Sequence, residues 1–219
     1  MARGRLITVE GLDGSGKSTL VEGLAGALRR GGRSVEVLRE PGGVRVAELI
    51  RDLVKNPALH IGARAEALLY AASRAQLVEE RIVPALAAGT WVLLDRFVDS
   101  SLAYQGAGRD LGVEAVAELN AFATGGLVAD RTLLLRIGAA ERHRRLAARG
   151  EPADRLEREP DAFFATIASA YDALADAEPE RFAVLDATQP PESVLAAAID
   201  ALPREWAARL IVHSPPPGH

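Results

Sequence analysis

One short glycine-rich segment, EGLDGSGKST at residues 10–19, constrains the fold more than any other feature of this sequence. Its residues match the pattern GxxxxGK[ST] at Gly11, Gly16, Lys17 and Ser18. The segment follows an apolar run at 6–9 and leads into a helix-like stretch at 17–30. A strand, a glycine-rich turn and a helix in this order predict a P-loop, in which backbone N–H groups surround phosphate oxygens at a helix N-terminus.

The roles expected within this segment follow from the chemistry of a nucleoside triphosphate. Glycines let the backbone approach the phosphates, Lys17 reaches the β- and γ-phosphates, and the Ser18 hydroxyl can bind Mg²⁺. The expected ATP-binding set is Gly11, Asp13, Gly14, Ser15, Gly16, Lys17, Ser18 and Thr19. The alternative is a glycine-rich turn with a solvated lysine. The motif predicts triphosphate binding but does not identify the acceptor of a phosphoryl group.

Short apolar runs alternate with longer helix-like stretches along the chain. The expected strands are 6–10, 34–38, 91–94, 132–137 and 182–185. The expected helices, rich in Ala, Leu, Glu and Arg, are 17–30, 44–54, 63–88, 113–123, 139–148, 161–177 and 192–202. Strands that are apolar throughout are typical of a parallel sheet covered on both faces. We therefore expect a three-layer α/β/α fold around a mostly parallel, five-stranded sheet.

Length and composition narrow the class of protein further. A chain of 219 residues suits one core, so we expect a single domain over 1–209 and a flexible, proline-containing tail over 210–219. The net charge of −4 argues against general nucleic-acid binding, and the absence of cysteine excludes disulfides and thiolate chemistry. No apolar run has membrane-spanning length and no signal peptide is found, so we expect a cytoplasmic protein without a membrane partner.

A second polar pair ends the third expected strand, in the sequence WVLLDR at 91–96. Ligands of parallel sheets bind at the carboxyl ends of the strands. We therefore expect Asp95 to bind Mg²⁺ together with Ser18, directly or through water, and Arg96 to hold a second phosphate group. The alternative is a structural Asp–Arg ion pair that closes a turn.

These segments together resemble the bacterial thymidylate kinases. The likeness covers EGLDGSGKST, REPGG at 39–43, the dense stretch from EALLYAASR to SLAYQGAGR at 66–109, RGEPADRLERE at 149–159 and DATQP at 186–190. It spans residues 5 to about 202 and is more specific than the P-loop alone. The resemblance implies a homodimeric, Mg²⁺-dependent kinase that transfers the ATP γ-phosphate to dTMP, giving dTDP and ADP.

The resemblance also implies an acceptor site. Arg96 matches the arginine that holds the acceptor phosphate, and Arg74 matches one that also hydrogen-bonds the thymine. Tyr70, one helical turn before Arg74, matches the aromatic residue that stacks on the base. The full dTMP-binding set expected in this way is Asp13, Tyr70, Arg74, Arg96, Ser101, Tyr104 and Gln105. Without the resemblance, Tyr70 would be read as core packing and Arg74 as part of a solvated helix face.

Three members of this set fall in SLAYQG, which we expect to be a loop after Arg96. Tyr104 matches the tyrosine that crowds the 2′ position of the sugar and so rejects ribonucleotides, whereas Ser101 and Gln105 match positions around base and sugar. Asp13 matches an acidic residue that reaches toward the sugar 3′-hydroxyl and the phosphates. The alternative for Tyr104 is an aromatic residue in an ordinary turn.

An arginine-rich segment at about 149–158 resembles the lid of nucleotide kinases, where arginines neutralise charge on the transferred phosphoryl group. Arg149 and Arg155 match the lid arginines best and join Lys17 and Arg96 as the expected catalytic cations. Gly150 and Pro152 favour a hinged loop. The alternative is a solvated, arginine-rich helix end with charge pairs.

Because of two departures from the family pattern, part of the lid assignment stays undecided. Thr166 and Ala168 stand where many relatives carry arginines, and the lid is one residue longer than in close relatives, which leaves the register between Arg149 and Arg155 open. Two other functions also remain open. One is a kinase for another nucleoside monophosphate or a deoxynucleoside, and the other is a nucleotide-binding switch without catalysis.

Overall fold

Five parallel strands form the centre of the computed structural model, which describes residues 3–150 and 152–207. The strands are β1 (Leu6–Gly11), β2 (Val35–Arg39), β3 (Trp91–Asp95), β4 (Arg131–Arg136) and β5 (Phe182–Asp186). They lie in the order β2-β3-β1-β4-β5, and every pairing is parallel. The tail expected at 210–219 lies outside the described residues, and the single domain over 1–209 stays a prediction.

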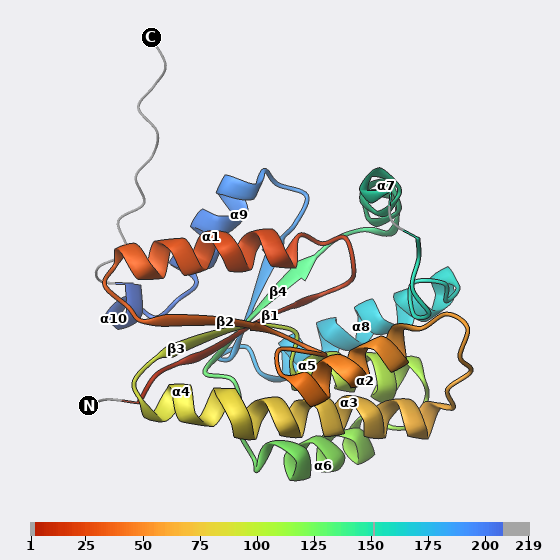
Figure 1. Cartoon of the computed structure of the whole chain (residues 1–219). Helices are drawn as coiled ribbons and strands as arrows, with labels where there is room; N and C mark the ends of the chain where they lie inside the picture. The colour runs from red at the N-terminus through yellow and green to blue at the C-terminus, as the bar shows by residue number, and fades with distance from the viewer. Residues whose placement is uncertain (1–2, 151, 208–219) are drawn as a thin grey trace.

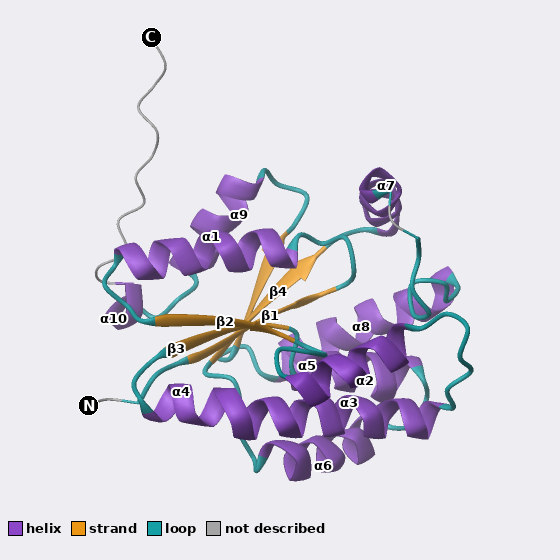
Figure 2. Ribbon diagram, in the orientation of Figure 1, coloured by secondary structure: helices purple, strands orange, loops and turns teal. Residues whose placement is uncertain are grey.

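Helices cover both faces of this sheet. They are α1 (Lys17–Arg30), α2 (Arg45–Lys55), α3 (Ala63–Leu77), α4 (Val83–Ala87), α5 (Val98–Ser101), α6 (Val113–Thr124), α7 (Ala139–Arg149), α8 (Asp161–Ala177), α9 (Pro191–Asp200) and α10 (Arg204–Ala207). Figures 1 and 2 show α1 and α9 on one side of the sheet and α3, α4 and α6 on the other. The expected three-layer α/β/α fold is therefore confirmed. Within residues 3–150 and 152–207, no helix is long and apolar enough to cross a membrane.

Side chains of each strand alternate between two hydrophobic cores. Ile7 of β1 packs in the core on the α1 side, with Leu24 of that helix. Leu6, its neighbour in β1, packs in the opposite core with Leu77 of α3. Successive residues of a strand point to opposite faces, so a strand covered on both sides must be apolar at nearly every position. Burial of each large aliphatic side chain stabilises the fold by about 1.5–3 kcal/mol.

The single helix expected over 63–88 contains a wide turn. Its middle is a π-helix, η1 (Val78–Ile82), between α3 and α4. Pro84 lies at the start of α4 and has no N–H to donate to the carbonyl four residues earlier. The backbone therefore changes its hydrogen-bond pattern ahead of the proline without breaking the rod.

The prediction of a loop around Ser101, Tyr104 and Gln105 is wrong, because this segment is helical. It consists of α5 followed by a π-helix, η2 (Leu102–Gly108), which packs between α6 and α8. A backbone buried in this way must satisfy its own polar groups, and a helix does so. Gly106 and Gly108 allow close packing in this segment. A Cβ on Gly108 would lie 2.8 Å from a ring carbon of Phe163.

The carboxyl ends of three neighbouring strands meet at one edge of the sheet. Asp95, at the end of β3, is in register with Val9 of β1 and with Arg39 of β2. The P-loop leaves β1 at this edge and leads into α1. Parallel pairing therefore brings the P-loop beside Asp95, although the two are far apart in the sequence.

Candidate active site

The P-loop adopts a conformation that requires glycine at several positions. Gly11, Gly14 and Gly16 have φ angles of 134°, 83° and 96°, a region that other residues rarely adopt. A Cβ on Gly11 would also lie 2.5 Å from the carbonyl oxygen of Leu135. The turn ends where α1 begins, at Lys17, so the free N–H groups of the helix start face the same space as the loop.

Lys17 is buried within this turn. Its ammonium donates hydrogen bonds to the carbonyl oxygens of Gly11, at 3.2 Å, and Leu12, at 3.0 Å. Burial, together with repulsion from Arg96, lowers the pKa of Lys17. The lysine is therefore held at the P-loop by its backbone carbonyls, within reach of any phosphate bound there.

A cavity of about 490 Å³ opens at the carboxyl edge of the sheet. The predicted site residues that line it are Asp13, Gly14, Gly16, Lys17, Ser18, Thr19, Tyr70, Arg74, Asp95, Arg96, Ser101, Tyr104, Gln105 and Arg149. Gly11, Ser15 and Arg155 are not among the residues that line it. Most of the P-loop and all of the expected acceptor residues thus share one cavity.

Ser18 and Asp95 lie side by side at the mouth of the P-loop. The Ser18 hydroxyl donates a 3.0 Å hydrogen bond to Asp95 Oδ2. Within the described part of the chain, no cluster of three or more His, Cys, Asp or Glu side chains could form a complete metal cage. Mg²⁺ usually takes one or two protein oxygens and completes its shell with water and phosphate. This pair of oxygen donors fits such a site.

Arg96 connects the end of β3 to the P-loop. Its Nη2 donates a 2.8 Å hydrogen bond to Asp13 Oδ1, and its Nη1 donates a 3.0 Å hydrogen bond to Ser100 Oγ. Its guanidinium also lies 5.1 Å from the ring centroid of Tyr104, a cation–π distance. The φ angle of Arg96 is 71°, an uncommon backbone conformation for a residue other than glycine.

The charges of this pair stabilise each other. Burial alone would raise the pKa of the Asp13 carboxyl, but attraction to Arg96 and Lys17 holds that pKa well below its ordinary value. Burial alone would lower the pKa of Arg96, but Tyr104 and Asp13 hold it well above its ordinary value. Both groups therefore stay charged near neutral pH.

Arg74 lies in the wall of the cavity, and its side chain is only 1% exposed. Its Nε donates to Glu40 Oε2 at 2.8 Å, and its Nη2 donates to the Phe97 carbonyl oxygen at 2.8 Å. Its Nη1 donates to Ser101 Oγ and to Asn120 Oδ1. Burial raises the pKa of Glu40, against the attraction of Arg74. Arg74 therefore joins α3, α5, α6 and the segment after β2 around the cavity.

Tyr70 and Gln105 also line the cavity. Burial, with repulsion from Glu66, raises the pKa of the Tyr70 phenol, so its ring is uncharged. The Gln105 amide donates a 2.9 Å hydrogen bond to Glu66 Oε1, which fixes the direction of its own carbonyl oxygen. An uncharged aromatic face and an oriented amide are suited to a flat, polar-edged ligand such as a nucleobase.

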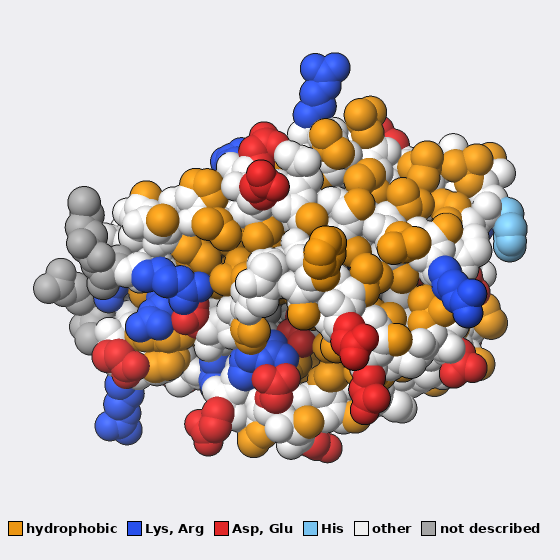
Figure 3. Space-filling view, turned by 90° about the horizontal axis from the view of Figure 1, so that it is seen from below, with side chains coloured by type: hydrophobic (Ala, Val, Ile, Leu, Met, Phe, Trp, Pro, Cys, Tyr) orange, Lys and Arg blue, Asp and Glu red, His pale blue; other side chains and the backbone are white. Residues whose placement is uncertain are grey.

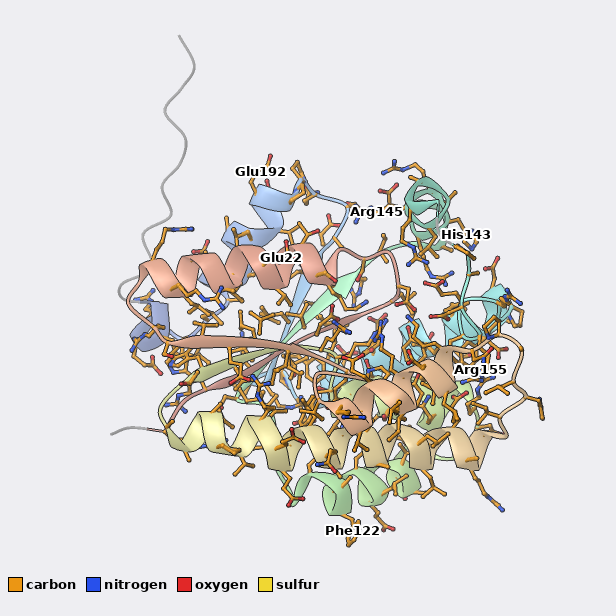
Figure 4. All side chains as sticks on the ribbon, in the orientation of Figure 1. Glu22, Phe122, His143, Arg145, Arg155 and Glu192 are labelled. Atoms are coloured by element: carbon orange, nitrogen blue, oxygen red, sulfur yellow. The ribbon has the colours of Figure 1, made fainter. Side chains whose placement is uncertain are left out.

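The two arginines expected in the lid have different surroundings. Arg149 lines the cavity and donates to the Glu157 carboxylate, with both N–O distances 2.9 Å. Arg155 donates to the Val54 carbonyl oxygen at 2.7 Å and to Glu66 Oε2 at 2.6 Å. The segment that carries Arg155 is thus bound to the end of α2 and the start of α3 (Figure 4).

Two further residues of the site have no specific role in the sequence prediction. Arg145 of α7 lines the cavity, donates to the Ala187 carbonyl oxygen at 2.7 Å and lies 3.4 Å from that of Ser15 (Figure 4). Its spacing from Arg149 puts both on one helix face, a signal that could have identified it. Glu40 of REPGG also lines the cavity, but its pairing with Arg74 depends on tertiary contact.

Comparisons with known proteins identify the family of this chain. A family model described as thymidylate kinase matches residues 9–198. A thymidylate kinase of Lactobacillus delbrueckii subsp. bulgaricus is 47% identical over 200 residues, which cover 90% of this chain and 94% of the relative. One from Deinococcus radiodurans is 46% identical over 194 residues, covering 89% and 94%. One from Clavibacter michiganensis is 48% identical over 194 residues, covering 89% and 92%. The chain belongs to the thymidylate kinase family.

Proposed function

We propose that this protein transfers the γ-phosphate of ATP to dTMP, giving dTDP and ADP. The observation that carries the proposal is the hydrogen bond between Arg96 and Asp13, which brings an acceptor-side cation to the P-loop. Donor and acceptor phosphates bound in one cavity can meet without either leaving the protein. The family membership and the aromatic and amide groups near Arg74 favour a pyrimidine monophosphate as the acceptor.

The donor half of the reaction uses the P-loop. The expected ATP-binding residues Gly11, Asp13, Gly14, Ser15, Gly16, Lys17, Ser18 and Thr19 form this loop and the start of α1. Lys17 exchanges its carbonyl partners for phosphate oxygens when ATP binds. Ser18 and Asp95 are the residues that would hold Mg²⁺, which supplies neutralisation of the charge between the ATP phosphates.

The acceptor half needs positioning rather than a general base. The phosphate of dTMP already carries about −1.5 to −2 charges near neutral pH, so one of its oxygens is a ready nucleophile. Arg96 holds this phosphate in line with the γ-phosphate, and Lys17 stabilises charge on the transferred group. The bond from the acceptor oxygen to γ-phosphorus forms as the bond to the bridging oxygen of ATP breaks, and ADP leaves.

The nucleoside of dTMP occupies the wall on the α3 side. In this proposal Tyr70 stacks on thymine, while Gln105 and Ser101 lie around base and sugar. Tyr104, whose ring is packed by Arg96 and whose edge contacts Phe163, closes the space beside the sugar 2′ carbon. Arg74 keeps this wall in shape through its protein partners, and it would exchange one of them to donate a hydrogen bond to the base.

The lid completes the catalytic set with Arg149 and Arg155. Arg149 is the better placed of the two, since it already lines the cavity. Arg155 does not line the cavity and contacts the buried carboxylate of Glu66 at 2.6 Å. We therefore assign the larger catalytic contribution to Arg149.

We further propose that the protein is a cytoplasmic homodimer. Large apolar side chains are exposed on three successively packed helices, with Leu49 of α2 64% exposed, Leu68 of α3 58% and Phe122 of α6 90%. Figure 3 shows hydrophobic side chains spread over the lower face of the molecule, where Figure 1 places α3, α4 and α6. A broad apolar area of this kind favours association with a second copy.

Separation of nucleotide products by chromatography tests the proposal. The wild-type protein with ATP, Mg²⁺ and dTMP should form dTDP and ADP in equal amounts. Lys17→Ala should form neither, while it still binds dTMP in a calorimeter. A wild-type protein that binds ATP yet forms no dTDP from dTMP would contradict the proposal and favour a nucleotide-binding switch.

A further inference from the structure

Glu10 is a carboxylate in the middle of the protein that no step of the proposed reaction uses. It lies in β1, next to the first glycine of the P-loop, and is 0% exposed. It accepts hydrogen bonds from the Phe97 backbone N–H at 2.7 Å, the Ser100 hydroxyl at 2.6 Å and the Tyr171 hydroxyl at 2.8 Å. A buried carboxylate is costly to keep, so this cluster of donors calls for an explanation.

Two of these donors lead directly to Arg96. Phe97 is its neighbour in the chain, and Ser100 Oγ accepts a 3.0 Å hydrogen bond from Arg96 Nη1. Glu10 therefore fixes two groups beside Arg96. One is the backbone N–H of Phe97, and the other is the Ser100 hydroxyl, which accepts a hydrogen bond from the Arg96 guanidinium. Glu10 itself is not among the residues that line the cavity, whereas Ser100 and Arg96 are.

Arg96 needs such support because of its backbone. Its φ of 71° is unfavourable for a side chain with a Cβ, and such a conformation persists only when surrounding contacts fix it. The bond from Phe97 N–H to Glu10 is one of these contacts, and the bond from the Arg96 N–H to the Val9 carbonyl oxygen, at 3.0 Å, is another. Both anchor the turn after β3 to β1.

We propose that Glu10 is a positioning residue for the acceptor phosphate, which acts by fixing the backbone turn and the guanidinium of Arg96. The inference rests on the proposed function, because it assigns Arg96 to the acceptor. Loss of the carboxylate would let Arg96 leave its uncommon conformation, so the acceptor phosphate would meet a cation that is no longer oriented. Binding of ATP, which depends on the P-loop backbone, would change little.

Burial and nearby charged groups both affect the ionisation of Glu10. Burial and repulsion from Asp99 raise its pKa to about 7, against the attraction of Arg96. Lys17 also lies near enough to be influenced by Glu10, and Tyr171 of α8 donates to it. The ionised form accepts from both hydroxyls and so matches the observed hydrogen bonds, whereas protonation would remove an acceptor.

The test uses steady-state kinetics of Glu10→Gln, which keeps the size of the side chain but removes its charge. We expect KM for the acceptor to rise by roughly tenfold to a hundredfold, since misplaced groups have effects of that order, with KM for ATP within about twofold of wild type. Ser100→Ala should give the same pattern. The double variant should be no worse than the more affected single variant, because both act on Arg96.

Thr8→Val provides a matched control. Thr8 lies in the same strand, is also fully buried, and its hydroxyl shares a 2.9 Å hydrogen bond with that of Thr132. Its loss should lower stability while leaving both KM values unchanged. If Glu10→Gln changes the two KM values equally or neither of them, the inference is wrong. If that variant does not fold, the inference is judged by the change in KM for the acceptor relative to KM for ATP in Ser100→Ala.

The wild-type protein in the same assay reports separately on the proposed function. If it uses dTMP poorly and another monophosphate well, the thymidylate assignment fails. The Glu10 inference is then judged with that monophosphate as the varied acceptor.

Discussion

The guanidinium of Arg96 lies 2.8 Å from the carboxylate of Asp13, so the end of β3 is bonded directly to the P-loop. Asp13 is a P-loop residue, and Arg96 follows Asp95, the partner of Ser18. The two contacts together bring the expected acceptor cation and the expected metal ligands to one edge of the sheet. A phosphate bound by Arg96 would therefore lie close to one bound by Lys17.

Replacement of Arg96 by lysine should impair the acceptor side of the reaction. Lysine keeps the charge but loses the planar fork that bonds Asp13 and Ser100 at the same time. We expect kcat/KM for dTMP to fall by about 10²–10³, as for the loss of an oriented charge-stabilising donor. Arg136→Lys is the control, since Arg136 ends β4 but pairs with Asp172 on the surface. Equal effects of the two substitutions would contradict this role.

Substitution of the two lid arginines should lower kcat to different extents. Arg149→Ala is expected to lower kcat by about 10³ or more, because arginines that contact the transferred phosphoryl group have effects of this size. Arg155→Ala should have the smaller effect on kcat, since its present partners are Glu66 and Val54. Arg144→Ala, which removes an exposed arginine paired with Glu141, is the control. A larger loss with Arg155→Ala than with Arg149→Ala would reverse the assignment.

The raised pKa of Glu10 predicts a specific dependence of stability on pH. Its folded value of about 7 lies above the ordinary 4.5, so folding favours the protonated form. Below pH ~4.5 the Glu10 carboxyl does not lower the free energy of unfolding. As the pH rises toward ~7 it lowers this free energy increasingly, and above that the decrease is constant. Because one pKa unit corresponds to about 1.4 kcal/mol, the shift from 4.5 to about 7 costs about 3.5 kcal/mol at high pH.

The measurement is the free energy of unfolding of wild type and Glu10→Gln by urea titration at several pH values. The stability of the variant relative to wild type should rise between pH ~4.5 and ~7 and stay level above it. Thr8→Val, which has no titrating side chain at that position, should show a constant difference from wild type. A relative stability of Glu10→Gln that does not change with pH would contradict the raised pKa.

The exposed apolar face predicts a mutation that separates the two copies. Phe122→Glu puts a charge in place of the most exposed of the three apolar side chains, on α6. Burial of an unpaired charge in an interface is unfavourable, so the variant should be a monomer in light-scattering measurements while the wild type is a dimer. Glu22→Lys, on α1 at the opposite side of the molecule in Figure 4, should remain a dimer. A monomeric wild type would contradict the proposed assembly.

Local sequence signals predicted the fold and the backbone of the P-loop well. The P-loop motif requires glycine at positions with positive φ, and the strands show their burial on both faces as unbroken apolar runs. These signals lie within a few neighbouring residues, so one sequence is enough to read them. The order of the strands and their parallel pairing then brought Asp95 to the P-loop, as expected for ligands at strand ends.

The cavity wall around Arg74 could be predicted only in part, because it depends on hydrogen bonds between residues far apart in the sequence. Arg74 binds Glu40, Ser101 and Asn120, which are 34, 27 and 46 residues away along the chain. Nothing in the sequence around Arg74 distinguishes it from a solvated arginine on a helix. The helical segment over 98–108 escaped prediction for a related reason, since Gly106 and Gly108 are turn signals whose packing role appears only in the fold.

The most direct test of the central claim is the choice of acceptor. The measurement is kcat/KM from ADP release with ATP and Mg²⁺, for dTMP, UMP, AMP and thymidine in turn. If Tyr70, Arg74, Arg96 and Tyr104 form a thymidylate site, dTMP should exceed each of the others by at least about tenfold. Tyr104→Ala should narrow the gap to UMP, because it removes the ring beside the sugar. Equal or better turnover of UMP, AMP or thymidine by the wild-type protein would contradict the account.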